Sequence, residues 1–228
     1  AADTPLLVRR PYTVVAAAGV GSLITVAALL ALSAWRDLSP GGLILAGVAI
    51  SSFFGAATMF LQYFAPDVQV AATVFWTFGD LGKARWRELT VMAIALAPAG
   101  AYFLWKRWSF NALLWGDDSA RSLGVSVHRI RLASLILAAL ISSVTTAFLG
   151  IIGFVGLIAP HIMRILLGQD HRFLFPCSAL AGGLLLLVSD ALARTVMAPV
   201  VLPVGILTSF AGAPLFIYLL ARHGGVRT

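Results

Sequence analysis

The stretch LASLILAALISSVTTAFLGIIGFVGLIAPHIM, residues Leu132–Met163, contains no charged side chain. As a single α-helix its roughly 32 residues would be about 48 Å long at about 1.5 Å per residue. That length exceeds the roughly 30 Å hydrocarbon core of a bilayer. The helix must therefore break, and three glycines spaced three residues apart mark the place. We predict a membrane span over residues 128–149 and a shorter helix over 153–167.

Charge-free runs recur along the chain. Its 228 residues are 60% hydrophobic and only 11% charged, whereas soluble domains carry about 25% charged residues. A helix needs about 20 apolar residues to cross a bilayer, so the composition predicts an all-α, polytopic membrane helical bundle. The other long runs without charge are Tyr12–Trp35, Leu38–Pro66, Leu89–Trp105, Phe173–Ser189 and Thr195–Ala221.

Two segments predict short, re-entrant or broken helices. After Pro66, the apolar part of DVQVAATVFWTFGDLG is about a dozen residues, too short to cross a bilayer. Near the C-terminus, APVVLPVGILTSFAGAP holds three prolines and two glycines, which predicts a half-helix or re-entrant element. The further spans expected are residues 12–34, 41–63, 88–105, 173–195 and 209–221.

One substantial polar segment, NALLWGDDSARSLGVSVHRIR, interrupts the apolar pattern. It has acidic residues toward one end and arginines toward the other. We expect two short helices, broken at Gly124, at the membrane surface. Four apolar residues form a modest stripe along this segment: Leu114, Ala120, Leu123 and Val127.

Lys and Arg counts predict which side of the membrane this segment occupies. With the polar segment in the cytosol, ten basic residues face that side and six the other, a weak positive-inside bias. The cytosolic set is Arg36, Lys106, Arg107, Arg121, Arg129, Arg131, Arg164, Arg172, Arg222 and Arg227. The opposite set is Arg9, Arg10, Lys83, Arg85, Arg87 and Arg194. The tryptophans follow the same division.

Several function classes are disfavoured by the residues themselves. The net charge of +7 is scattered in ones and twos between apolar runs, unlike a nucleic-acid-binding patch. The single cysteine, Cys177, excludes an internal disulfide. Zinc-binding and serine-hydrolase motifs are absent from the sequence. Asp80 and Asp190 could form an acid pair in an intramembrane aspartyl enzyme, but positions at helix ends in reach of water are the simpler explanation for both.

Transport is the class that the broken helices favour. Irregular backbone at membrane depth is tolerated where it is buried or lines a cavity. The few ionisable groups within the spans argue against a proton- or sodium-driven carrier. The sequence has no phosphate-binding G-x-x-x-x-G-K-[ST] loop, so ATP, if used, binds to another chain.

Three long segments of the chain resemble those of a known family. The segments ALLWGDDSARSLGVSVHRIR, GFVGLIAPHIMRILLGQDHRFLFPCSALAGGLLLLVSDALAR and LPVGILTSFAGAPLFIYLL are similar to those of FecCD-type permeases. These are the membrane subunits of type II ABC importers for iron–siderophores, haem and cobalamin. The resemblance covers residues 1–228 as a single transmembrane permease domain. It corresponds to the family fold from about the fourth of some ten helices onward.

The resemblance implies a role for the polar segment, residues 110–127, as the cytoplasmic coupling helices that sit in a cleft of the ATPase. The residues implied are Asp118, Ala120, Arg121, Leu123 and Gly124. The alternative is a merely solvated loop. Arg194 matches an arginine that docks the substrate-binding protein, and the alternative is a snorkelling anchor at the end of a span.

Further roles follow from the same resemblance. The short helix after Pro66 matches one that helps to close the pathway, with Phe75, Trp76 and Phe78 as gate or packing residues. The segment after residue 149 is expected to be a hinge or tight-packing element. Its residues are Gly150, Gly153, Gly156 and Pro160. His161 is expected to be structural rather than a metal or haem ligand.

The implied assembly is an importer in a bacterial or archaeal cell (inner) membrane. It contains a second permease copy, two ATP-binding subunits that carry ATP and Mg²⁺, and a periplasmic or lipid-anchored binding protein. The chain itself is expected to hold no metal or cofactor and to catalyse no reaction. A non-transporting membrane scaffold, or a degenerate short paralogue, is the alternative.

Overall fold

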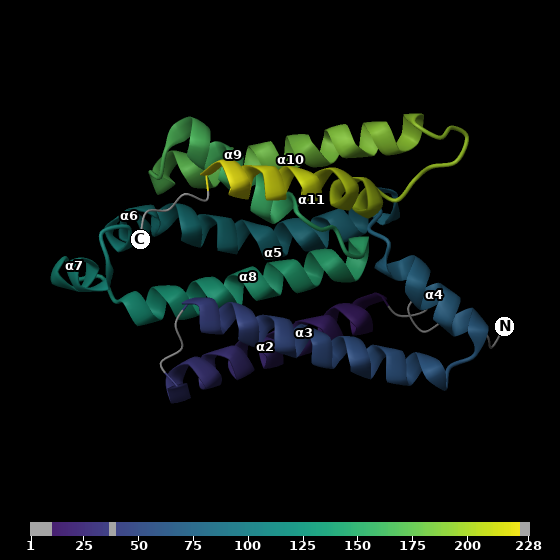
Figure 1. Cartoon of the computed structure of the whole chain (residues 1–228), viewed down its shortest axis with the longest axis horizontal. Helices are drawn as coiled ribbons and strands as arrows, with labels where there is room; N and C mark the ends of the chain where they lie inside the picture. The colour runs from purple at the N-terminus through teal and green to yellow at the C-terminus, as the bar shows by residue number, and fades with distance from the viewer. Residues whose placement is uncertain (1–10, 37–39, 224–228) are drawn as a thin grey trace. The chain divides into compact units, whose positions relative to one another are not determined.

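A computed structural model describes residues 11–36 and 40–223, which form ten α-helices and one 3-10 turn, η1 (Figure 1). This confirms the predicted all-α class. The helices are α2 (Pro11–Arg36), α3 (Pro40–Tyr63), α4 (Asp67–Thr77), α5 (Trp86–Trp105), α6 (Arg107–Leu113), α7 (Asp117–Ser122), α8 (Val127–Leu149), α9 (Val155–Leu167), α10 (His171–Thr195) and α11 (Val204–His223). η1 covers Leu81–Lys83. Arg9, Arg10 and Arg227 of the charge count lie outside the described residues.

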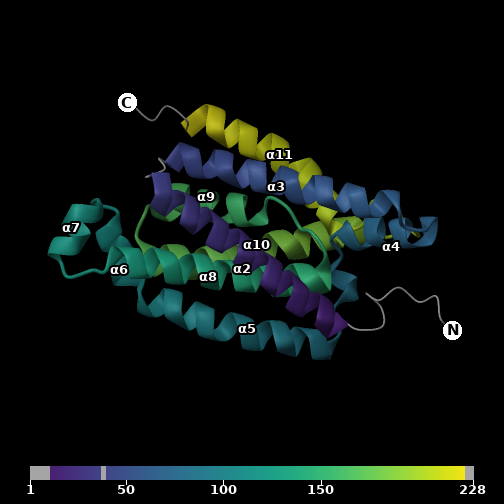
Figure 2. The ribbon, with the colours of Figure 1, turned by 90° about the horizontal axis from the view of Figure 1, so that it is seen from below.

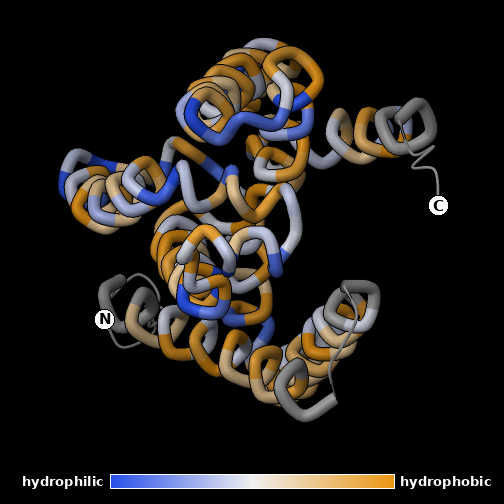
Figure 3. Tube along the Cα trace, turned by 90° about the vertical axis from the view of Figure 1, so that its left-hand side faces the viewer, coloured by the Kyte–Doolittle hydropathy of each residue, from blue (hydrophilic) through white to orange (hydrophobic). Residues whose placement is uncertain are grey.

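Four described helices are long and apolar enough to cross a membrane by length and composition. They are Leu45–Tyr63, Trp86–Trp105, Val127–Leu149 and His171–Thr195. Three further apolar segments, Ala16–Leu32, Val155–Leu167 and Val204–Tyr218, are shorter. Apolar residues predominate along these helices (Figure 3), and many large apolar side chains are exposed. That surface is typical of helices whose solvent is lipid.

The chain divides into two compact units. Among the described residues, one contains those up to residue 77 together with 135–148, and the other contains residues 78–134 and those from 149 onward. In the first unit α2 contacts α3. A Cβ atom on Gly19 of α2 would lie 3.9 Å from Oγ of Ser143, a buried residue of α8. Small residues at such positions let helices approach closely.

The second unit is built around α10, which contacts α5, α6, α9 and α11. Its closest neighbour along the chain, α9, is beside it in both ribbon views (Figure 2). At Gly182 the backbone of α10 approaches α9, because a Cβ atom there would lie 3.6 Å from Val155 and 3.7 Å from Ala159. Ala159 is buried, as is Ala193 further along α10. The small side chains between these helices therefore set their spacing.

The predicted break in the long apolar stretch is confirmed. Helix α8 ends at Leu149, Gly150 adopts a φ of +80°, and α9 begins at Val155. Phe154 caps α9 in the left-handed region with a φ of 66°. Such a conformation is uncommon for a residue with a side chain, and it costs about 1 kcal/mol or more. The surrounding packing must hold it in place.

Two boundary predictions are wrong. The polar segment breaks at Gly116 as well as at Gly124, because α6 and α7 are separate helices on either side of Gly116. The segment expected to be a half-helix divides at Val204: residues 198–203 are not helical, whereas residues 204–214 belong to α11, which is continuous through Pro214. The glycines of α11 permit close packing rather than breaking the helix, since a Cβ atom on Gly212 would lie 2.5 Å from Cβ of Phe154.

Candidate functional site

The polar segment ends its second helix with a Schellman motif. The N–H of Gly124 donates to the carbonyl of Arg121 at 2.9 Å, and the N–H of Val125 donates to that of Ala120 at 3.0 Å. Gly124 has a φ of +80°, the left-handed conformation that this motif requires and that glycine adopts without strain. The cap reverses the chain between α7 and α8.

Ion pairs attach α7 to the start of α8. Arg131 of α8 pairs with both carboxylate oxygens of Asp117, at 2.8 and 2.9 Å. Within α7, Arg121 pairs with Asp118 at 3.0 Å, an exposed contact of the kind that contributes little to stability. Bidentate pairing restricts orientation more than a single contact does, so Asp117 is the more important of the two acids for the placement of α7.

The predicted apolar stripe divides into a buried part and an exposed part. Ala120 is 0% exposed and Val127 is also buried, so both pack inside the segment. Leu123, by contrast, is 71% exposed and Trp115 is 81% exposed. Large apolar side chains on a polar segment are typical of protein interaction surfaces, where tryptophan is enriched.

Three residues join the beginning of this segment to the start of α10; we call them the Asn111 clamp. The side-chain nitrogen of Asn111 donates to Oδ1 of Asp170 at 2.7 Å. Its oxygen accepts from the backbone N–H of His171 at 2.8 Å and lies 3.0 Å from Nδ1 of the His171 imidazole, which donates to it in the tautomer protonated at Nδ1. Asp170 also caps α10 by accepting from the N–H of Arg172 at 2.9 Å.

The hydrogen bond from Asn111, followed by that from the N–H of Arg172, lowers the pKa of Asp170 below its ordinary value of 3.8. A carboxyl group whose pKa is lowered by folding contributes stability above its unfolded pKa and loses it as pH falls through the folded pKa. We therefore expect Asp170→Asn to lower the unfolding midpoint by a constant amount near neutral pH. The difference should disappear once Asp170 is protonated, below its ordinary range.

Thermal unfolding of both proteins in detergent, from about pH 8 to about pH 3, measures this effect. Asp118→Asn is the matched control, because Asp118 is 98% exposed and lies outside the clamp. It should follow the wild type at every pH. A difference for Asp170→Asn that persists unchanged at the lowest pH would contradict the assignment.

On the side predicted to be extracytoplasmic, three backbone segments meet at Gly79. Its carbonyl accepts from the N–H of Gly205 at 2.9 Å, and Phe78 forms an isolated parallel bridge with Ile151. A Cβ atom on Gly79 would lie 2.3 Å from the carbonyl oxygen of Ile151, and one on Gly205 would lie 2.6 Å from the same oxygen. We call this meeting point the Gly79 junction.

The predicted gate residues come just before Gly79 in the sequence. Phe75 and Trp76 belong to α4, and Phe78 follows it directly. Phe75 is exposed, whereas Trp76 and Phe78 are half-buried. The carbonyl of Phe78 accepts from Nζ of Lys83 at 2.9 Å. Burial lowers the pKa of Lys83, and the nearby Asp80 carboxylate partly opposes that shift.

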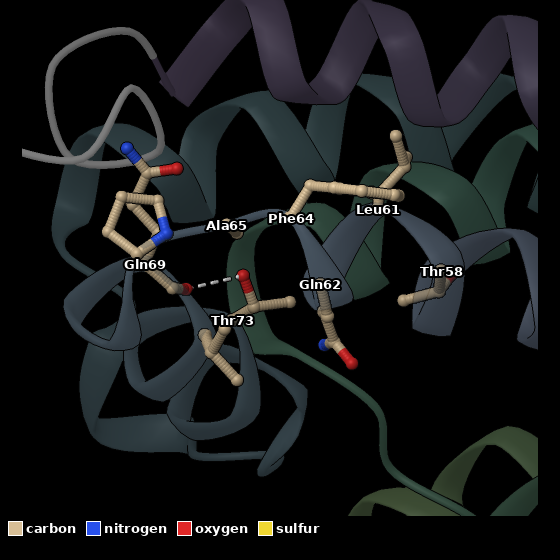
Figure 4. Close-up of a pocket in the computed structure, with 9 residues that line it drawn as sticks. Thr58, Leu61, Gln62, Phe64, Ala65, Gln69 and Thr73 are labelled. Carbon is tan, nitrogen blue, oxygen red and sulfur yellow. Dashed lines mark hydrogen bonds between the residues drawn. The ribbon is translucent and has the colours of Figure 1, made fainter.

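A pocket of about 490 Å³ lies where α3 leads into α4 (Figure 4). Its polar lining consists of neutral side chains from both helices, and the hydroxyl of Thr73 donates to the carbonyl of Gln69 at 2.8 Å. The lining residues are Thr58, Leu61, Gln62, Phe64, Ala65, Pro66, Gln69, Val70 and Thr73. A lining without charge suits neutral hydrogen-bonding groups or apolar surface more than ions.

Arg194 has an intramolecular partner that the sequence reading did not assign. Asp190, one turn earlier in α10, accepts from Nε at 2.8 Å and from Nη2 at 3.2 Å. The Arg194 side chain is 52% exposed and that of Asp190 is 21% exposed. Because a guanidinium has five N–H donors, this pairing orients the arginine while leaving donors for another carboxylate.

The four predicted hinge residues have different surroundings. Gly150 has a positive φ that glycine adopts readily, and a Cβ atom on Gly153 would lie 3.4 Å from Oγ of Ser209 in α11. Nothing lies within 4 Å of a Cβ atom on Gly156. Pro160 lies inside α9 and has no N–H to donate to the carbonyl of Gly156, four residues earlier. The break itself therefore begins at Gly150, directly after α8.

Among the described residues, no group of three His, Cys, Asp or Glu side chains is arranged to hold a metal ion. His161, half-buried in α9, belongs to no such group.

Residues 5–222 match the sequence model of the FecCD transport family. The chain belongs to this family. A protein of Methanocaldococcus jannaschii named as an ABC transporter permease is 55% identical over 95% of this chain and 62% of its own length. The hemin transport permease HmuU of Yersinia pestis is 40% identical, over 93% of this chain and 64% of its own length. The chain thus spans less than two thirds of these relatives.

A solved structure supports the same fold. An ABC transporter described as metal-chelate type, in an inward-facing conformation, superposes with a TM-score of 0.77 and 29% identity. The match covers 92% of this chain and 73% of that one. The vitamin B12 import permease BtuC of Vibrio cholerae is 33% identical over 93% of this chain. The resemblance to FecCD-type permeases is therefore confirmed.

For this FecCD family member, sequence reasoning missed Asn111, Asp170, Gly79 and Gly205, and it missed the pairing of Asp190 with Arg194. A weak signal existed for Asp170, since an aspartate just before an apolar run is typical of a helix N-cap. Asp190 and Arg194 have the i, i+4 spacing of a helical ion pair. The partners of Asn111 and Gly79 are too distant in sequence for any local pattern to indicate them.

Proposed function

We propose that this chain is the permease subunit of an ATP-driven importer that moves an iron chelate, haem or cobalamin into the cytoplasm of a bacterium or archaeon. The observation that carries the proposal is the polar segment of α6 and α7. It is a capped, ion-paired element on which Trp115 and Leu123 are exposed, in a chain whose other described helices are mostly apolar. Relatives named for hemin and vitamin B12 transport support the class of cargo.

In this proposal two copies of the chain form the pathway and two ATPase subunits bind ATP and Mg²⁺ below them. The exposed apolar side chains of α7 and its surroundings enter a cleft of the ATPase, and closure of the ATPase dimer pushes on this segment. The Schellman cap at Gly124 and the Asp117–Arg131 pair keep α7 at a fixed angle to α8, so the push is transmitted rather than absorbed.

Arg194 is the proposed docking residue for the substrate-binding protein. Asp190 holds the guanidinium in one orientation, so little side-chain entropy remains to be lost when a carboxylate of the binding protein arrives. An exposed ion pair of this kind is itself worth little. Arg194 can therefore share its guanidinium between Asp190 and a carboxylate of the binding protein, or exchange one for the other, at a small cost in free energy.

The proposal is tested by coexpressing the chain with the ATPase and binding-protein subunits of its source organism and measuring uptake into proteoliposomes. Hemin, cobalamin and a ferric hydroxamate are supplied in parallel. We expect ATP-dependent uptake of one of them. A complex that assembles but moves none of the three, and hydrolyses no ATP in response to the binding protein, would indicate a non-transporting scaffold instead.

Arg194→Glu should weaken docking of the binding protein by roughly 30-fold or more, because losing one partner of an interfacial charge pair costs about 2 kcal/mol or more. The substitution also places two carboxylates one turn apart in α10. Affinity is measured by titrating labelled binding protein onto the purified complex. Arg87→Glu, the same charge reversal at the start of α5, is the matched control and should change affinity little. Unchanged affinity for Arg194→Glu would remove Arg194 from the docking site.

A further inference from the structure

The Asn111 clamp joins segments that are 59 and 60 residues apart in the chain. Asn111 uses both polar atoms of its amide, donating to the Asp170 carboxylate and accepting from the backbone N–H of His171 and, in the tautomer protonated at Nδ1, from its imidazole. An amide satisfied at both ends has one orientation, so α6 is held in a specific position relative to the first residues of α10.

An aromatic cluster surrounds the clamp. The rings of Phe110 and His171 are stacked with centroids 5.8 Å apart, and Phe175 lies edge-on to Phe110 at 5.1 Å. Phe103, from the last turns of α5, is 5.6 Å from Phe175. Arg172 lies over the Trp108 ring at 4.5 Å. Aromatic pairs in these geometries add about 0.5–1.5 kcal/mol each beyond the apolar area that they bury.

The clamp lies at one end of α10, and the Asp190–Arg194 pair lies near the other. A helix of 25 residues is roughly 37 Å long at about 1.5 Å per residue, enough to cross a membrane. Helix α10 also contacts α9 and α11. A displacement of α6 would therefore reach the body of the second unit through the start of α10, by a route separate from the one through α7 and α8.

We propose that the Asn111 clamp is a coupling joint, in which Asn111, Asp170 and His171 make α6 and α10 move together. Through it, engagement of the ATPase at α6 and α7 is communicated to the end of α10 that carries Arg194. By linkage, docking of the binding protein at Arg194 acts on the ATPase through the same joint. Asn111 is thus a positioning residue for transport, and the inference rests on the proposed function.

The chemistry of the clamp allows a swap experiment. Asn111→Asp places a second carboxylate against Asp170 and removes the amide donor, so the joint should open. Adding Asp170→Asn restores it in mirror form, because the new amide donates to the new carboxylate. That carboxylate still accepts from His171, and the amide oxygen accepts from the N–H of Arg172. Asp170→Asn alone keeps an amide–amide pair and should have a small effect.

The readout is ATP hydrolysis by the complete complex in proteoliposomes, with and without binding protein. The quantity of interest is the increase in ATP hydrolysis rate that the binding protein causes. We expect Asn111→Asp to lower this increase at least tenfold. The double variant Asn111→Asp/Asp170→Asn should recover it to within about twofold of wild type. Asn111→Ala, which removes the hydrogen bonds without adding repulsion, should give a loss of at least threefold. Gln169→Glu is the matched control, since it adds the same charge beside Asp170 but outside the clamp.

Full stimulation in both Asn111→Asp and Asn111→Ala would overturn the inference and leave the proposed function intact. A double swap that folds but remains as poor as Asn111→Asp would overturn it as well. If Asn111→Asp does not fold, recovery of folding and of stimulation in the double swap still supports the pairing. A wild-type complex without any stimulated hydrolysis or uptake would overturn the proposed function, and the coupling role of the clamp with it.

Discussion

Gly79→Ala is expected to destabilise the protein by about 3 kcal/mol, at the upper end of the usual cost of overpacking, and to abolish transport. The new methyl group would lie 2.3 Å from the carbonyl oxygen of Ile151 and 2.6 Å from the Ile152 side chain. The backbone cannot retreat easily, because the carbonyl of Gly79 accepts from Gly205 and the N–H of Asp80 donates to Leu149. Relief of the clash would separate the segments that meet at the Gly79 junction.

Unfolding in mixed micelles of detergent and denaturant measures the loss, and uptake into proteoliposomes measures its consequence. Gly205→Ala should behave similarly, since its methyl group would meet the same carbonyl oxygen at 2.6 Å. Gly183→Ala is the matched control: it lies in α10, nothing is within 4 Å of the added Cβ atom, and alanine is the better helix former. Wild-type stability in Gly79→Ala would show that the junction is not held as closely as described.

Gly124→Pro is expected to abolish transport while leaving membrane insertion intact. Proline holds φ near −65° and has no N–H, whereas Gly124 has a φ of +80° and donates to Arg121. The Schellman cap of α7 is therefore lost, and the segment carrying Leu123 changes its angle to α8. The apolar spans that direct insertion are untouched.

Insertion is measured by the amount of folded protein extracted from the membrane, and coupling by uptake per ATP hydrolysed. Gly124→Asn is the matched control, because asparagine adopts the left-handed conformation more readily than other residues with a side chain and retains the N–H donor. It should keep most of the uptake. Normal uptake by Gly124→Pro would refute the assignment of this segment to coupling.

Local sequence patterns predicted most of the helical layout. Hydropathy and the absence of charge identified α2, α3, α5, α8 and α10 to within a few residues, because a bilayer imposes the same length and apolarity on every span. The need for a break after α8 followed from length, and the glycine series marked its place. The pattern failed at α11, where prolines and glycines that weaken an isolated helix are accommodated by close packing against its neighbours.

The coupling segment was visible in the sequence as a polar interval, and Gly124 was identified within it. Its attachment to the rest of the molecule was not. Asn111 and Asp170 are 59 residues apart, and neither spacing nor hydropathy relates a polar residue of α6 to the cap of α10. The same holds for Asp117 and Arg131, whose pairing depends on the turn that Gly124 makes.

The sequence alone thus specifies a membrane bundle with a break after α8 and a polar surface segment. The information lies in the apolar composition, the distribution of charge and the positions of the glycines. These properties depend on the surrounding lipid and on local backbone geometry, and both are determined by residues close together in the sequence. Packing in three dimensions alone decides which distant residues meet: Gly79 with Ile151 and Gly205, and Asn111 with the cap of α10. Such contacts arise when helices fold against one another, and only then do their loops and ends come within bonding distance.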